Sequence, residues 1–175
     1  MRQKMKKRYS TLPWKSILVI LLSVILLIGN PLEAKIINVE NVKVISVVDG
    51  DTAHMELPGY GRQTIRTWGI DCPEKKQKFG NAATEFYTSL IQGKEVFLKV
   101  RSKDIYGRLI AQVFVDNVDI GLYMVQNGYA WHYVSITKNK ELAKAQAHAE
   151  EQKLGLWRDA QPTAPWVYRK LPKWQ

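Results

Sequence analysis

The chain is predicted to fold as an α+β domain that is mainly β. Five short segments are rich in β-branched and other apolar residues, and turn residues separate most of them. They are the expected strands: residues 42–48, 52–57, 63–70, 95–100 and 109–115. A segment with helical periodicity lies between the third and the fourth. A helix after the third of five strands predicts a five-stranded Greek-key barrel of the OB type, accompanied by three helices.

The first three strands are delimited by two turns. Asp49-Gly50-Asp51 separates the first strand from the second, and Pro58-Gly59-Tyr60-Gly61 separates the second from the third. Three consecutive strands with short turns predict an antiparallel meander.

Three helices are expected at residues 79–92, at about 118–127, and from Thr137 or Asn139 to Gly155. The first has apolar residues at helical spacing and a glycine, Gly93, placed to end it. The second follows the turn Asp116-Asn117. The third can be capped by a Thr or Asn side chain. Residues 129–134, between the second and third helices, are expected to be extended or irregular.

The N-terminal residues 1–34 are predicted to direct export. They carry six basic residues against one acidic residue and contain the apolar run Ile17–Ile28, as in a secretory signal peptide. The run is shorter than the ~20 residues of a typical membrane-spanning helix. Leu32-Glu33-Ala34 is a candidate cleavage site, but Leu32 is larger than the preferred small residue. An uncleaved N-terminal membrane anchor formed by residues 17–28 is therefore the alternative, and both options place the folded part outside the cytoplasm, as a secreted, periplasmic or anchored protein.

The charge of the chain favours a polyanionic partner. The 175 residues predict one folded domain with a formal net charge of +10, of which +5 belongs to residues 1–34 and +5 to the remainder. A positive excess favours phosphate binding without specifying the partner. The single cysteine, Cys72, excludes an intramolecular disulfide, and no Cys/His cluster indicates zinc.

Three short motifs carry the candidate chemistry: Asp49-Gly50-Asp51-Thr52, the pattern R-x4-D-x-P-E over residues 66–74, and Tyr106-Gly107-Arg108. In the second motif, Pro73 restricts the backbone between two carboxylates. A cation and carboxylates at one strand end form a candidate site for a phosphate and a metal ion. Aspartate ligands without His or Cys favour Ca²⁺ or Mg²⁺.

In this order and at these separations, the three motifs resemble those of the staphylococcal nuclease (thermonuclease) family of calcium-dependent nucleases. The resemblance spans about Val42 to Asp159. It implies an OB-fold domain over residues 35–159 that hydrolyses DNA and RNA with low sequence specificity. It also implies cleavage of the P–O5′ bond, by both endonuclease and exonuclease action. We expect a monomer.

The resemblance also implies a role for individual residues. Asp51 and Asp71 would bind Ca²⁺ together with the backbone carbonyl of Cys72, a position where many family members have threonine. Glu74 resembles the candidate general base. Arg66 and Arg108 resemble the two phosphate-binding arginines, whose planar forks match phosphate oxygens.

Three more residues are expected to contact substrate. Tyr106 matches a family tyrosine near the phosphate, and Lys103 is a candidate electrostatic contact. Tyr133 is the nearest candidate for stacking on a base, although direct register with the family places Val134 and Ile136 there.

Two alternatives remain at this stage. The Pro-, Trp- and Lys/Arg-containing residues 160–175 are expected to form a loosely structured tail. The tail either contacts nucleic acid, through Trp166, Tyr168, Arg169 and Lys170, or packs on the domain. The whole domain is either an enzyme or a catalytically silent OB module that binds nucleic acid or protein. The presence of Glu74 and both arginines argues for the enzyme.

Overall fold

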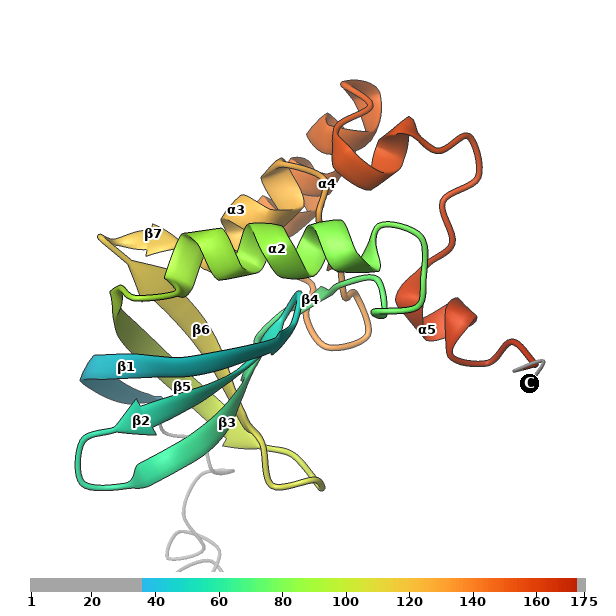
Figure 1. Ribbon diagram of the computed structural model, residues 1–175. Coiled ribbons are helices and arrows are strands. Elements are labelled where there is room, and N and C mark those ends of the chain that lie inside the picture. The colour runs from blue at the N-terminus through green and yellow to red at the C-terminus, as the bar shows by residue number, and fades with distance from the viewer. Residues whose placement is uncertain (1–35, 173–175) are drawn as a thin grey trace, which may run out of the picture. The chain divides into compact units, whose positions relative to one another are not determined.

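The structure, a computed structural model, describes residues 36–172. Its main sheet contains β1 (Ile37–Asp49), β2 (Thr52–Leu57), β3 (Gly61–Thr67), β5 (Glu95–Lys103) and β6 (Leu109–Val115), in the order β3-β2-β1-β5-β6. A parallel pairing between β3 and β6 closes the sheet into a barrel (Figure 1). The predicted five-stranded OB-type barrel is confirmed.

The remaining elements lie at one end of the barrel. The short strand β7 (Val118–Asp119) pairs with β6, and β4 (Ile70–Asp71) pairs with β8 (Trp131–His132). The helices are α2 (Gly80–Ile91), α3 (Ile120–Gln126), α4 (Lys140–Glu151), the 3-10 turn η1 (Gly155–Arg158) and α5 (Pro165–Tyr168). Figure 1 shows α2 lying across the end of the barrel, with α3 and α4 beyond it.

Most element positions agree with the sequence, but several bounds differ. The strand expected at residues 95–100 extends to Lys103, and residues 118–119, expected to begin the second helix, form β7. The first strand begins at Ile37 rather than residue 42, because its first half pairs with β5 and its second half with β2. The expected strand over residues 63–70 is divided after Thr67. Gly69 adopts a positive φ of 80°, and the chain then leaves the barrel to pair with β8.

The expectation of a loose C-terminal tail is wrong for residues 160–172. Pro165 begins α5, since its fixed φ suits the first turn of a helix. The indole of Trp166 lies edge-on to Trp131 and stacks on Tyr133. Of the two alternatives for this segment, contact with nucleic acid or packing on the domain, the structure shows packing on the domain.

The core fills the barrel and the space beneath α2. Its fully buried side chains include Val42, Met55, Ile65, Leu98 and Val113 from the strands and Tyr87 and Ile91 from α2. The hydroxyl groups of Tyr87 and Thr67 are 2.8 Å apart and share a hydrogen bond. This buried bond fixes α2 to the end of β3, at the residue that follows Arg66 in the chain.

No helix within residues 36–172 is long and apolar enough to cross a membrane. The apolar run 17–28 and the expected cleavage site lie outside the described residues.

The connection between β4 and α2 depends on a close backbone approach at Gly80. A Cβ atom at this position would lie 1.9 Å from the carbonyl oxygen of Glu74. Because the obstructing atom belongs to the backbone, no side-chain rotation can relieve the contact. Only glycine therefore lets α2 begin directly against the loop that carries Glu74.

We predict that Gly80→Ala destabilises the protein by about 1–3 kcal/mol, the usual cost of adding atoms to a closely packed site. Asn81→Ala is the matched control, since Asn81 is exposed in the same helical turn, and it should change stability by less than about 0.5 kcal/mol. Urea unfolding followed by tryptophan fluorescence measures both. Equal stability of the two variants would contradict the close approach.

Candidate active site

The strand register brings the three motifs together. In the β2–β3 hairpin, Thr52 lies opposite Arg66, which places Arg66 beside the turn that contains Asp51. In the closing β3–β6 pair, Ile65 lies opposite Leu109, which places Arg108 at the same end of the barrel. Residues of all three motifs line one cavity of about 440 Å³. Barrel closure therefore assembles a site from segments as distant in sequence as those of Asp51 and Arg108.

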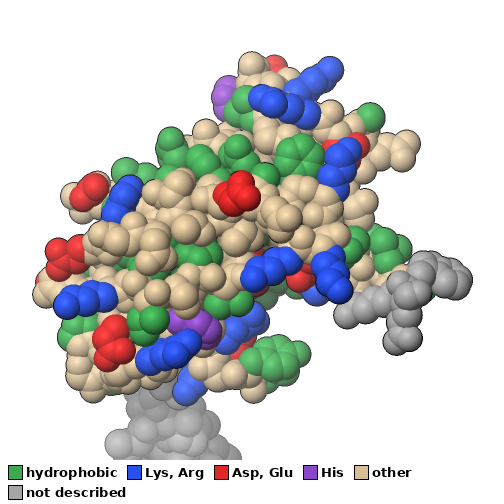
Figure 2. Space-filling view, viewed as in Figure 1, with side chains coloured by type: hydrophobic (Ala, Val, Ile, Leu, Met, Phe, Trp, Pro, Cys, Tyr) green, Lys and Arg blue, Asp and Glu red, His purple; other side chains and the backbone are tan. Residues whose placement is uncertain are grey.

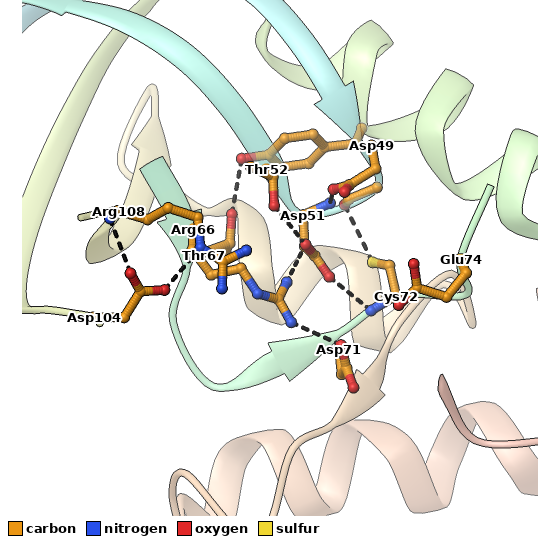
Figure 3. A network of polar contacts seen from close by, with 12 residues as sticks. Asp49, Asp51, Thr52, Arg66, Thr67, Asp71, Cys72, Glu74, Asp104 and Arg108 are labelled. Carbon is orange, nitrogen blue, oxygen red and sulfur yellow. Dashed lines mark hydrogen bonds and ion pairs between the residues drawn. The ribbon is translucent and has the colours of Figure 1, made fainter. Parts of the chain in front are cut away.

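Asp51 and Asp71 are buried and share one cation. Their exposed fractions are 5% and 1%. Arg66 forms an ion pair with Oδ1 of Asp51 through Nη1, and its Nη2 donates to Oδ1 of Asp71 at 2.7 Å. Figure 3 shows the guanidinium lying between the two carboxylates. Burying two carboxylates without such a partner would be costly, so Arg66 compensates both.

This donor set fits a hard divalent cation. The described residues contain no group of three His, Cys, Asp or Glu side chains placed to hold a metal ion. The two aspartates, however, are close enough for one guanidinium to contact both. Two carboxylates supplemented by backbone, water and substrate oxygens suit Ca²⁺ or Mg²⁺ rather than a soft metal.

The side chain of Cys72 is not part of this donor set. Its thiol donates to the carbonyl oxygen of Gly50 at 3.1 Å, and burial raises the pKa of the thiol well above its ordinary value. The thiol is therefore neutral and engaged elsewhere. The backbone N–H of Cys72 donates to Oδ2 of Asp51 at 2.8 Å and so orients that carboxylate.

Glu74 lies on a loop fixed by Gln77. The backbone N–H of Glu74 donates to Oε1 of Gln77 at 3.1 Å, and the backbone N–H of Gln77 donates to the carbonyl of Glu74 at 2.7 Å. The Glu74 side chain is partly exposed and lines the cavity. This combination suits a base that acts on a water molecule, since the loop is held while the carboxylate reaches solvent.

Arg108 is oriented by Asp104. The Nε of Arg108 donates to Oδ2 of Asp104 at 2.7 Å, and the backbone N–H groups of Tyr106 and Arg108 both donate to Oδ1 at 2.9 Å. Desolvation acts to raise the pKa of the Asp104 carboxyl, but these hydrogen bonds outweigh it and the pKa is lowered overall. Among the described residues Asp104 is the only hydrogen-bonding partner of the Arg108 side chain, so both of its Nη nitrogens remain available to an anion.

The three expected substrate-contacting residues are placed differently. Tyr106 lines the cavity and is 78% exposed, with the Arg108 guanidinium 5.6 Å from its ring centroid. Tyr133 lines the cavity wall and stacks on Trp166 at an interplanar angle of 12°. Lys103 is exposed at the end of β5 and is not among the residues that line the cavity. Val134 and Ile136, the candidates from direct register, are also outside it.

A third arginine, Arg169, enters the site from the C-terminal segment. Its Nη1 donates to Oε1 of Glu74 at 2.7 Å and to Oδ1 of Asp71 at 3.2 Å, and its Nη2 donates to Oδ2 of Asp71 at 2.7 Å. The hydrogen bonds to Asp71 raise the pKa of Arg169 above its ordinary value, so its side chain is charged. Figure 2 shows basic and acidic side chains gathered on this face, beside the C-terminal segment. The sequence identified Arg169 only as a tail residue, since no motif connects it to Asp71.

Comparison with known proteins identifies similar nucleases. The family described as "Staphylococcal nuclease homologue" matches residues 64–159. The chain is 38% identical to an "Uncharacterized endonuclease" of Escherichia coli O157:H7, over 73% of this chain and 83% of the relative. It is 34% identical to an "Uncharacterized endonuclease" of Haemophilus influenzae, over 88% and 86%. It is also 36% identical to "Staphylococcal-like nuclease CAN1" of Arabidopsis thaliana, over 61% of this chain and 33% of the plant protein.

The Asp104–Arg108 contact predicts a pH-dependent contribution to stability. Because the pKa of Asp104 is lowered in the folded protein, the contact stabilises above the unfolded-state pKa and is lost as the pH falls through the folded-state value. Asp104→Asn should therefore reduce stability, by less than about 1 kcal/mol at pH 7, and this difference should shrink below about pH 4.

Urea unfolding of wild type and variant between pH 7 and pH 3 measures the effect. Asp116→Asn is the control, since Asp116 is exposed at a positive φ that asparagine also adopts. A difference for Asp104→Asn that stayed constant with pH would show that charge does not anchor Arg108.

Proposed function

Because the chain belongs to the staphylococcal nuclease family, we propose that it is a calcium-dependent nuclease that hydrolyses DNA and RNA with low sequence specificity. The observation that carries this proposal is the single cavity containing two buried carboxylates, a partly exposed glutamate and two motif arginines. In the proposed reaction water attacks phosphorus and the P–O5′ bond breaks.

The metal site would be formed by the side chains of Asp51 and Asp71 and the backbone carbonyl of Cys72. Bound Ca²⁺ would supply positive charge to the scissile phosphate and to a water molecule. The present partner of the two aspartates, Arg66, can then contact phosphate oxygens with the same fork that now spans both carboxylates. Arg66 therefore keeps an anionic partner throughout, because the incoming phosphate replaces a carboxylate in contact with its guanidinium.

The chemistry of the residues follows from their positions. Glu74 accepts a proton from the attacking water, whose oxygen forms the new bond to phosphorus. Arg66 and Arg108 stabilise the negative charge that accumulates on the phosphate oxygens. As the P–O5′ bond breaks, the 5′ oxygen leaves and takes up a proton, so the products are a 3′-phosphate and a 5′-hydroxyl.

Low sequence specificity is proposed because the cationic groups of the cavity address phosphate, which carries no base information. Tyr106 and Tyr133, at the cavity, can stack on any base, and stacking discriminates weakly between sequences. Neither contact requires or excludes a 2′-hydroxyl, and we therefore propose both DNA and RNA as substrates for a monomeric enzyme.

The alternative is a catalytically silent OB module that binds nucleic acid without cleaving it. It would require the basic surface and the aromatic residues, but not a base and two arginines around one cavity. The presence of Glu74, Arg66 and Arg108 in the same cavity therefore favours the enzyme.

We further propose that residues 1–34 direct the chain out of the cytoplasm, since a basic start precedes an apolar run of signal-peptide length.

The export proposal predicts that the full chain is recovered outside the cytoplasm and that a chain lacking residues 1–34 stays within it. Cell fractionation distinguishes the two locations. Mass measurement of the recovered protein then separates cleavage after Ala34 from retention as a membrane anchor. Cytoplasmic location of the full chain would refute the proposal.

The metal proposal predicts that a chelator abolishes strand cleavage while salt-sensitive binding of nucleic acid persists, because the basic surface attracts phosphates without a metal. Added Ca²⁺ should restore cleavage. Asp51→Asn should need a higher Ca²⁺ concentration for the same rate, since one charged ligand becomes neutral. Cleavage of labelled DNA and RNA, with parallel binding measurements, gives both readouts. Cleavage that survives exhaustive chelation would refute the metal requirement.

Glu74→Gln is the companion variant, because it removes the base and keeps both aspartates. It should still bind Ca²⁺ and DNA and lose about 10²–10⁴-fold in cleavage rate at saturating Ca²⁺. Wild-type protein that binds DNA and never cuts it, at any Ca²⁺ concentration, would instead establish the silent module.

A further inference from the structure

Arg169 occupies the acidic side of the cavity through a two-pronged contact. One terminal nitrogen of its guanidinium contacts both Asp71 and Glu74, and the other contacts the second oxygen of Asp71. Planar bidentate pairs of this kind are the stronger class of ion pair, although the Arg169 side chain is 42% exposed, which weakens the attraction through solvent screening.

The segment that contains α5 and Arg169 is held on the loop that carries Glu74. The Gln77 side chain contacts Glu74 through Oε1 and donates to the carbonyl of Thr163 through Nε2. The Tyr168 hydroxyl donates to the carbonyl of Lys76 at 3.1 Å. Figure 1 shows α5 lying beside the connection between β4 and α2. Arg169 is thus presented to the site by a docked segment.

The contacts of Asp71 show what a metal ion would have to displace. Its Oδ1 accepts from both Arg66 and Arg169, and its Oδ2 accepts from Arg169. Both oxygens of this proposed ligand are therefore occupied by guanidinium groups. A cation that binds Asp71 would meet these two positive charges, and the departure of one guanidinium would relieve that repulsion.

Arg66 and Arg169 differ in how many contacts each would lose on leaving Asp71. Arg66 also contacts Asp51, lies on a barrel strand and has a proposed phosphate partner. Arg169 contacts only Asp71 and Glu74 through its guanidinium within the described residues, and it follows a four-residue helix near the end of the chain. Arg169 can leave by rotation of an exposed side chain, without any change in the barrel.

From these contacts we propose that Arg169 is an internal competitor for the metal site. It neutralises Asp71 and Glu74 while no divalent cation is bound, and Ca²⁺ displaces it. Its affinity for the two carboxylates therefore sets the Ca²⁺ concentration at which the site fills, and it keeps Glu74 paired until then. The inference rests on the proposed calcium dependence, because it concerns the ligand Asp71.

The test is a Ca²⁺ titration of the full chain without nucleic acid, followed by NMR. The backbone amide of Cys72 reports on the metal site, since it donates to Asp51, and the Arg169 Nε–H reports on the competitor. In wild type both signals should change with the same midpoint. Arg169→Gln should lower that midpoint by at least about tenfold, because a single and a double charge about 4 Å apart interact by more than this factor even at the dielectric constant of water.

Lys170→Gln is the matched control. It removes the same charge one residue later, from an exposed side chain with no ion pair among the described residues. A long-range effect of net charge would lower the midpoint equally in both variants, whereas local competition lowers it only in Arg169→Gln. Arg169→Lys, which keeps the charge and loses the fork, should fall between Arg169→Gln and wild type.

Three results would overturn the inference. Equal midpoints for wild type, Arg169→Gln and Lys170→Gln would show that Arg169 does not compete, and Ca²⁺-dependent cleavage would stand unaffected. A Cys72 amide that titrates while the Arg169 signal stays constant would identify Arg169 as a permanent clasp. If neither wild type nor any variant bound Ca²⁺ at any concentration, both the inference about Arg169 and the proposed calcium dependence would fail.

Discussion

The guanidinium of Arg66, held between Asp51 and Asp71, is the contact on which the arrangement of the site depends. Each aspartate is nearly inaccessible to solvent, and burying its charge there without a cation would be costly. Arg66 can serve both because its strand pairs with β2 on one side and β6 on the other. The barrel closure and the charge compensation therefore depend on the same residue position.

A buried ion pair of this kind is weak evidence for stability, because well-packed apolar residues of similar volume would often stabilise a fold as well. The ion pair instead matters because its members can bind other charged partners. The carboxylates can exchange one cation for another, and the arginine can exchange carboxylate for phosphate. Without ligands, Arg66 and the two aspartates neutralise one another. When a metal ion and a phosphate bind, each of these side chains exchanges one oppositely charged partner for another, and no charge is left without a partner.

The sequence predicted those parts of the molecule that depend on local pattern. The strands 52–57 and 109–115 follow from apolar and β-branched runs between turns. The start of α4 follows from Asn139, whose side chain caps the helix. The gathering of Asp51, Arg66, Asp71, Glu74 and Arg108 in one cavity was implied by the resemblance of the three motifs to the nuclease family. Arg169 could not be found this way. It is 98 residues from Asp71, and its position depends on the packing of Trp166 against Trp131 and Tyr133, which no periodicity encodes.

This difference bears on how metal affinity is determined in such a site. The motif residues supply the ligands. The cationic side chains that compete with the metal for those ligands can come from any segment that the fold places beside the site. In this chain that cation lies ten residues beyond the segment matched by the family. Two proteins with the same motifs can therefore fill their metal sites at different concentrations, because one guanidinium at a few ångströms changes the local potential as much as the loss of a carboxylate ligand would.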